Sequence, residues 1–85
     1  MIKKKAVIQL ENGLEARPVA MLVQLASQFE SEIYIESEER KVNAKSIMGM
    51  MTLGLGNGES VNIYANGEDE EKAIESISKY LVSQK

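Results

Sequence analysis

Apolar and polar residues alternate in four stretches of the chain, a pattern typical of strands that bury one face. The pair Asn12-Gly13 follows the first stretch and favours a turn, because both residues tolerate positive φ. A polar turn at residues 37–40 joins the second and third stretches into a hairpin. The alternation predicts strands at residues 2–10, 31–37, 40–44 and 60–65.

Two longer stretches, residues 17–29 and 73–81, repeat apolar residues at spacings of three and four, as amphipathic helices do. Pro18 suits the first turn of a helix, where its missing N–H would have had no partner. Four acidic residues at 68–71 precede the last stretch, and this order of charge stabilises a helix through its dipole. Ser46 suits the N-cap of a third, shorter helix.

The order of these elements is β-α-β-β-α-β-α. Strands with one apolar face and helices with one apolar side predict an α+β fold, in which helices cover one face of an antiparallel sheet. A hydrophobic fraction of 44% is too high for a disordered chain. We therefore expect a single domain over residues 1–85, since domains of this length are common.

Composition removes several classes of function. The chain has 10 basic and 13 acidic residues, and this net charge of −3 argues against direct binding of nucleic acid. It contains neither histidine nor cysteine, which excludes imidazole bases, thiolate nucleophiles and metal sites built on either residue. The apolar run near the N-terminus is too short for a signal peptide or a membrane span. We expect a cytoplasmic protein that is not an enzyme, needs no cofactor or metal, and does not bind membranes.

The first candidate site is the start of the helix at Arg17. A helix N-terminus offers unpaired N–H groups and the positive end of a dipole, and an arginine there adds donors for an anion. A simpler interpretation is that Glu15 stabilises the helix electrostatically while Arg17 is a solvated surface charge. On the pattern alone the second interpretation is the more economical.

The second candidate site is Ser46 and the short helix after it. Serine is a common capping residue, and on its own that interpretation suffices. The helix, however, is apolar on nearly every side, so we expect some of the side chains at positions 47, 48, 50 and 51 to be exposed. Exposed methionines suit an adaptable docking surface, whereas buried ones belong to a core, and the pattern leaves both open.

Two motifs at matching separation carry a family resemblance. The segment Asn12-Gly13-Leu14-x-Ala16-Arg17-Pro18, followed by Lys45-Ser46-Ile47-Met48-Gly49, resembles the HPr phosphocarrier family of the sugar phosphotransferase system. The resemblance covers essentially the whole chain. It implies an open-faced β-sandwich, with a four-stranded antiparallel sheet and three helices on one face.

One departure from that family bears on function. The family's phosphoacceptor histidine lies between Leu14 and Ala16, where this chain has Glu15. A carboxylate is a poor nucleophile toward phosphorus unless a metal site supports it, so we expect no histidine-type phosphotransfer. This departure makes the chain similar to the Crh (catabolite repression HPr) branch of the family, which lacks the histidine and acts only in regulation.

The resemblance assigns roles to the second motif. Ser46 is similar to the regulatory serine that HPr kinase/phosphorylase phosphorylates with ATP, and the phosphorylated protein would be a corepressor of catabolite control protein A, a LacI-type repressor. A charged contact is expected from Arg17. Lys45 would hold the phosphate or guide the kinase. The apolar contacts would come from Ile47, Met48 and Met51.

Other interpretations remain open at this stage. The chain fits a phosphocarrier HPr whose histidine has been replaced by Glu15, and it also fits a scaffold domain whose Ser46 is never modified. The resemblance further allows a homodimer in which two copies exchange the first strand, with a hinge at Asn12-Gly13.

Overall fold

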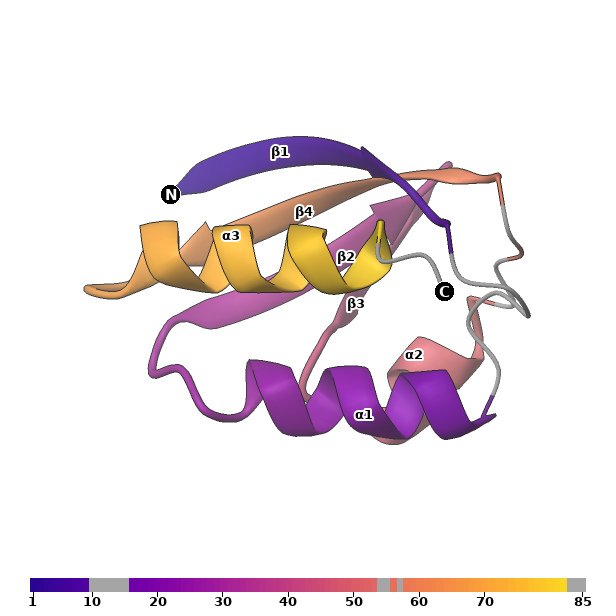
Figure 1. Ribbon diagram of the computed structural model, residues 1–85, viewed down its shortest axis with the longest axis horizontal. Helices are drawn as coiled ribbons and strands as arrows, with labels where there is room; N and C mark the ends of the chain where they lie inside the picture. The colour runs from indigo at the N-terminus through magenta and orange to yellow at the C-terminus, as the bar shows by residue number, and fades with distance from the viewer. Residues whose placement is uncertain (10–15, 54–55, 57, 83–85) are drawn as a thin grey trace.

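The computed structural model describes residues 1–9, 16–53, 56 and 58–82. Within these residues, four strands and three helices follow the predicted order (Figure 1). The predicted turn at Asn12-Gly13 lies outside them. The elements are β1 (Ile2–Val7), α1 (Ala16–Ala26), β2 (Glu32–Ser37), β3 (Arg40–Asn43), α2 (Ile47–Met51), β4 (Ser60–Asn66) and α3 (Glu70–Leu81).

The four strands form one antiparallel sheet in the order β1-β4-β2-β3, so β1 and β3 are its edges. The helices lie together on one face (Figure 1). Helix α3 packs against β1 and β4, α2 packs against β3, and α1 contacts both other helices. This arrangement confirms the predicted α+β open-faced sandwich.

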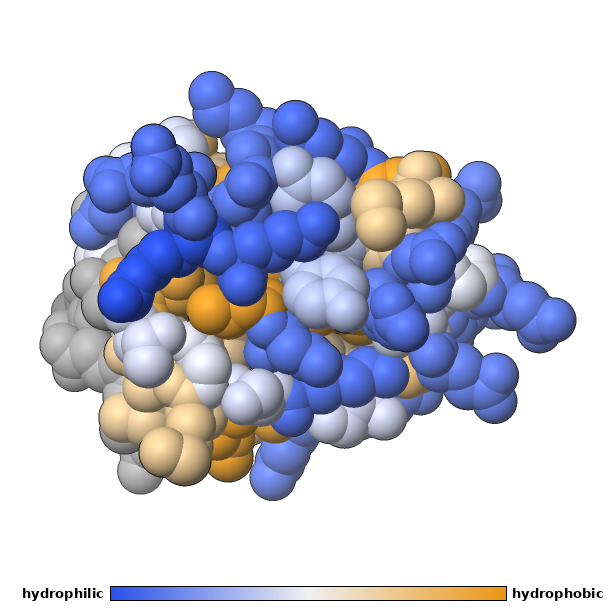
Figure 2. All heavy atoms as spheres, turned by 180° about the vertical axis from the view of Figure 1, so that it is seen from behind, coloured by the Kyte–Doolittle hydropathy of each residue, from blue (hydrophilic) through white to orange (hydrophobic). Residues whose placement is uncertain are grey.

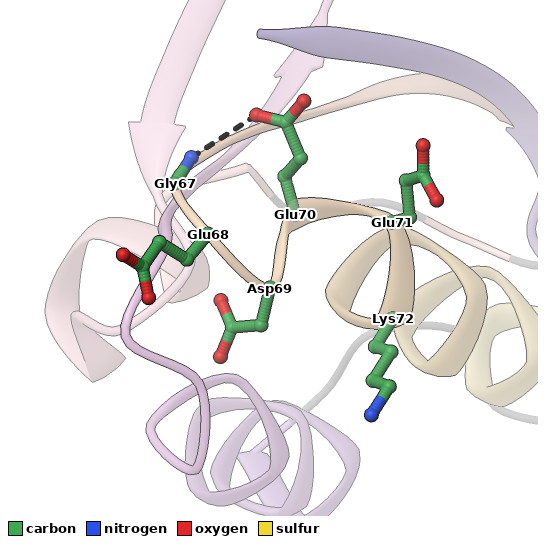
Figure 3. Close-up of a pocket in the computed structure, with 6 residues that line it drawn as sticks. All are labelled: Gly67, Glu68, Asp69, Glu70, Glu71 and Lys72. Atoms are coloured by element: carbon green, nitrogen blue, oxygen red, sulfur yellow. Dashed lines mark hydrogen bonds between the residues drawn. The ribbon is translucent and has the colours of Figure 1, made fainter.

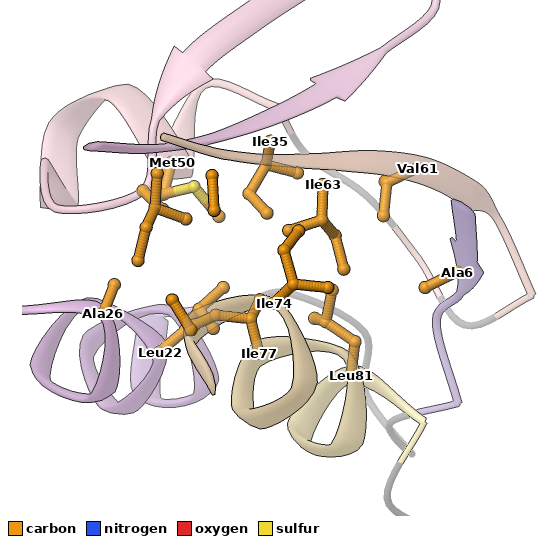
Figure 4. Close-up of a cluster of buried hydrophobic side chains, with 14 of the residues drawn as sticks. Ala6, Leu22, Ala26, Ile35, Met50, Val61, Ile63, Ile74, Ile77 and Leu81 are labelled. Atoms are coloured by element: carbon orange, nitrogen blue, oxygen red, sulfur yellow. The ribbon is translucent and has the colours of Figure 1, made fainter. Parts of the chain in front are cut away.

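Alternation along the strands decides which side chains enter the core. In β4, Val61, Ile63 and Ala65 are buried, while the residues between them are partly exposed. The helices supply the opposite wall of the core, through residues on the predicted stripes such as Leu22 and Ile77 (Figure 4). Burial of these apolar side chains is the main force that holds helices to sheet. Among the described residues, every helix is too short or too polar to span a lipid bilayer.

Two predicted boundaries were too long. Strand β1 ends at Val7, although the backbone of Ile8 still exchanges hydrogen bonds with the Glu59 carbonyl and the Gly58 amide. Helix α1 ends at Ala26 and not at Phe29. The chain there closes tight turns, with the Phe29 amide donating to the Ala26 carbonyl at 3.2 Å, because it must reverse direction to enter β2.

A hydrogen-bonded clasp joins the loop before β2 to the loop before α3. The Asp69 carboxylate accepts bonds from the amides of Glu30 and Ser31, both at 3.0 Å, and a third from the Ser31 hydroxyl. Gly67 packs so closely here that a Cβ atom would lie 2.7 Å from the Cα of Ser31. Figure 3 shows the neighbouring bond, in which Glu70 accepts from the Gly67 amide at 3.1 Å. The clasp thus fixes two loops far apart in sequence.

The clasp makes stability depend on pH. Hydrogen bonds from the Ser31 hydroxyl and the Glu30 amide lower the pKa of Asp69, against a smaller opposing effect of desolvation. A carboxyl whose pKa is lower in the folded state stabilises the fold at neutral pH, and this contribution disappears as the pH falls below about 4.

We expect Asp69→Asn to lower the melting temperature by several degrees at pH 7, because its amide group cannot accept all three bonds as the carboxylate does. The difference from the parent chain should shrink in thermal melts below about pH 4. Glu68→Gln, at an exposed neighbouring carboxylate, is the control and should change little. An Asp69→Asn difference that persists unchanged at low pH would contradict the role given to the carboxylate.

Candidate functional site

Ser46 lies at the N-cap of α2, as the sequence predicts. Its backbone is extended, with φ −113° and ψ 114°, and its Oγ accepts a hydrogen bond from the Gly49 amide at 3.1 Å. The Ser46 carbonyl accepts from the Met50 amide at 2.9 Å. Ser46 is half-buried, and its hydroxyl caps the first turn of the helix.

Helix α2 is held to the sheet by one side chain and one close approach. Met50 is completely buried in the core (Figure 4). A Cβ at Gly49 would lie 3.3 Å from Ser46 Oγ and 3.6 Å from the Cβ of Val42 in β3. The missing side chain at Gly49 therefore lets the first turn of α2 lie close to both β3 and the serine hydroxyl.

With Met50 buried, the other large side chains of α2 face outward. Ile47 is 47% exposed, Met48 81% and Met51 50%, and we call these three residues the α2 apolar surface. Figure 2 shows an apolar group over α2, at the lower left, on an otherwise mostly hydrophilic side of the molecule. Of the four apolar side chains of α2, only Met50 therefore belongs to the core, and a docking role for the other three stays a prediction.

The C-terminal end of α2 is capped from elsewhere in the chain. Thr52 donates its hydroxyl to the Gly49 carbonyl at 2.6 Å, and the Arg40 guanidinium donates to the Thr52 carbonyl. Arg40 begins β3, so the β2-β3 hairpin supports the helix at its free carbonyl end. The α2 apolar surface is therefore oriented by contacts at both ends of the helix.

The structure describes only one of the charged side chains that the sequence singled out. Lys45 Nζ donates to the Phe29 carbonyl at 2.7 Å, so this ammonium group links the turn after α1 to the start of α2. Arg17 is in the first turn of α1, but its side chain and all of Glu15 lie outside the described residues. The expected contacts of Arg17 and Lys45 with a phosphate or a partner stay predictions, as does the expectation that Glu15 accepts no phosphate.

Sequence reasoning missed two residues of this region, Arg40 and Met21. Met21 is 54% exposed on α1, the helix that contacts α2. The sequence could have indicated this exposure, because Met21 lies off the buried stripe formed by Val19, Leu22 and Val23. For Arg40, by contrast, no sequence pattern near the residue indicates that it reaches a carbonyl twelve residues away.

A shallow pocket lies at the start of α3, lined by residues 67–72 (Figure 3). Its acidic side chains do not form a cation site. Asp69 is bound in the clasp, and Glu70 accepts from the Gly67 amide and pairs with the N-terminal ammonium at 3.5 Å. In the part of the chain that the structure describes, no three acidic side chains converge well enough to hold a metal ion.

Comparisons with known proteins place this geometry in a family. Residues 2–83 match the family described as the PTS HPr component phosphorylation site. The HPr-like protein Crh of Bacillus subtilis is 44% identical over 81 residues, which cover 95% of each chain.

Two solved structures are also similar. The crystal structure of phosphocarrier protein HPr from Bacillus anthracis has a TM-score of 0.92 at 44% identity and covers 94% of this chain and 95% of that one. The crystal structure of Bacillus subtilis Crh, described as a dimer with a swapped domain, has a TM-score of 0.80 at 42% identity and covers 100% and 98%. The fold, the matched residues and these identities show that the chain belongs to the HPr family.

Proposed function

We propose that this protein is a regulatory member of the family, phosphorylated on Ser46 by HPr kinase/phosphorylase and acting as a corepressor of catabolite control protein A. The observation that carries the proposal is the placement of a partly exposed serine, Ser46, directly before the α2 apolar surface. Histidine phosphotransfer has no part in it, because the chain contains no histidine.

The modification follows from the position of the hydroxyl. Ser46 Oγ attacks the γ-phosphorus of ATP, ADP leaves, and the hydroxyl proton passes to a base of the kinase. The product carries a charge of about −1.5 to −2 at neutral pH. This charge lies at the amide end of α2, where backbone N–H groups favour an anion.

A partner can then distinguish two forms of one surface. In the unmodified protein, Ile47, Met48 and Met51 present apolar area beside a neutral hydroxyl. In the phosphorylated protein the same area borders a dianion. An arginine or lysine next to an apolar groove on the repressor would favour the second form, with Arg17 adding a charged contact from α1.

The competing function is that of a phosphocarrier HPr whose histidine has been replaced by Glu15. The similarity to the Bacillus anthracis phosphocarrier, at the same 44% identity as Crh, favours this candidate. A test must therefore address position 15 separately from position 46.

A homodimer formed by exchange of β1 is a further part of the proposal. Strand β1 is an edge strand that pairs only with β4 and packs on α3, so a second copy could supply the same strand. The swapped dimer of Bacillus subtilis Crh supports this possibility. The expected hinge at Asn12-Gly13 lies outside the described residues.

The first test is phosphorylation itself. With HPr kinase/phosphorylase and ATP, mass spectrometry should find one phosphate, and the Ser46→Ala variant should take up none. Ser27→Ala, at an exposed serine after α1, is the matched control and should be phosphorylated normally. Removal of the cap costs α2 about 1 kcal/mol, so circular dichroism should show that Ser46→Ala remains folded. Failure of the parent chain to accept phosphate would refute the proposal.

The second test concerns the α2 apolar surface. Met48→Ala should lower the affinity of the phosphorylated protein for catabolite control protein A about tenfold, since apolar anchors at interface centres contribute more than about 1 kcal/mol. Its melting temperature should not change, because Met48 is mostly exposed. Val82→Ala removes an exposed apolar side chain after α3 and should bind as the parent does. Equal losses in both variants, measured by calorimetry, would exclude a specific surface.

The third test separates the two candidate functions. Enzyme I and phosphoenolpyruvate should transfer no phosphate to the parent chain, because a carboxylate at position 15 is a poor acceptor. Transfer to the parent chain and onward to a sugar permease component would replace the regulatory proposal with the phosphocarrier one. The Glu15→His variant is the positive control for recognition by enzyme I.

A further inference from the structure

The face of the sheet opposite the helices carries a defined group of side chains. Tyr34 of β2 is paired directly with Tyr64 of β4 at the centre of the sheet. Lys3 of β1 is paired with Tyr64, and Lys41 of β3 is paired with Glu36 of β2. Directly paired residues project from the same face, and their neighbours Ile33, Ile35 and Ile63 face the core. We call Lys3, Tyr34, Glu36, Lys41 and Tyr64 the open-face cluster.

Specific contacts hold this cluster in place. Lys41 Nζ lies 4.3 Å from the ring centroid of Tyr64 and 5.3 Å from that of Tyr34, and Lys3 Nζ lies 5.7 Å from the Tyr64 ring. Such distances give cation–π attraction. The Tyr64 hydroxyl donates to Glu36 Oε1 at 2.7 Å. The side chains are therefore ordered before any partner arrives.

The face has an excess of positive charge. Lys3, Lys5 and Lys41 are exposed, and within the described residues none of them forms a close ion pair, although Lys3 and Lys41 interact with Glu36 at longer range. They outnumber the two carboxylates of this face, Glu32 and Glu36. Hydrogen bonds from Tyr64 and then Asn62 lower the pKa of Glu36, so its charge is already satisfied within the cluster. Positive charge on one face of a chain with net charge −3 points to an acidic partner.

We propose that the open-face cluster binds a carboxylate-rich segment of another protein, with Lys3 and Lys41 contacting its carboxylates and the two tyrosines supplying contact area. Tyrosine is enriched at protein interfaces, and side chains that are already ordered lose less entropy on binding. Figure 2 shows mainly hydrophilic atoms on the side of the molecule away from α3, as a polar interface requires. The surface shares no residue with the Ser46 site, so it is independent of the proposed function.

Single-stranded nucleic acid fits the same face less well. Bases bind by stacking on free aromatic rings, whereas lysine ammonium groups already lie over Tyr34 and Tyr64. An acidic polypeptide needs no stacking on these rings, so it is the occupant that their contacts with lysine favour.

The test is an NMR titration of the ¹⁵N-labelled full chain with a poly-glutamate peptide at low salt. Amide shifts should saturate and be confined to the four strands, and they should weaken at high salt. The double variant Lys3→Glu/Lys41→Glu should bind at least about tenfold more weakly. Lys72→Glu/Lys79→Glu changes the net charge equally at exposed positions of α3 and should retain binding.

Three results would overturn the proposal. Equal losses in both double variants would mean that only net charge matters. Tighter binding of an oligothymidylate than of poly-glutamate would identify a nucleic-acid surface instead. Shifts outside the sheet, or none at all, would show that this face is not the site. If Lys3→Glu/Lys41→Glu fails to fold, Lys3→Gln/Lys41→Gln should replace it. This variant should also bind poly-glutamate more weakly than the parent chain does.

Discussion

A helix of five residues makes only about one and a half turns, and one side of it can face a core. In α2 the side chain that faces the core is that of Met50, which is completely buried. Three other large apolar side chains must then point to solvent, although their exposure is unfavourable on its own. The burial of one methionine thus creates the apolar surface, and Arg40 and Ser46 set its orientation from the two ends of the helix.

Most of the fold could be predicted from the sequence, because alternation and helical spacing are local signals. The buried residues of β4 and α3 lie where periodicity puts them. The two overlong boundaries have a common cause, since an apolar pattern continues past the point where the backbone has to turn. Phe29 still packs against the core after its helix has ended, so hydrophobicity alone could not locate that end.

The candidate site also combines features that the sequence could predict with features that it could not. The capping role of Ser46 and the exposure of some apolar side chains of α2 were predictable from a short apolar helix, but the pattern did not indicate that Met50 is the buried one. The bond from Lys45 to the Phe29 carbonyl and the clasp at Asp69 join residues 16 and 38 or more positions apart. Nothing near either residue in the chain indicates its partner. Such contacts are set by how the layers pack, and only a structure reveals them.

The hydroxyl oxygen of Ser46 has one role in the structure and a second, competing role in the proposed function. Ser46 Oγ accepts the amide hydrogen that closes the first turn of α2, and the same atom would carry the phosphoryl group. Esterification leaves that oxygen a weaker acceptor and brings three stronger ones within reach of the turn. The absent side chain at Gly49 is what allows that turn to close, since a Cβ there would lie 3.3 Å from Ser46 Oγ. Phosphorylation at Ser46 would therefore weaken the hydrogen bond that begins α2 and offer phosphate oxygens in its place, so the modification would act directly on the helix that carries the apolar surface.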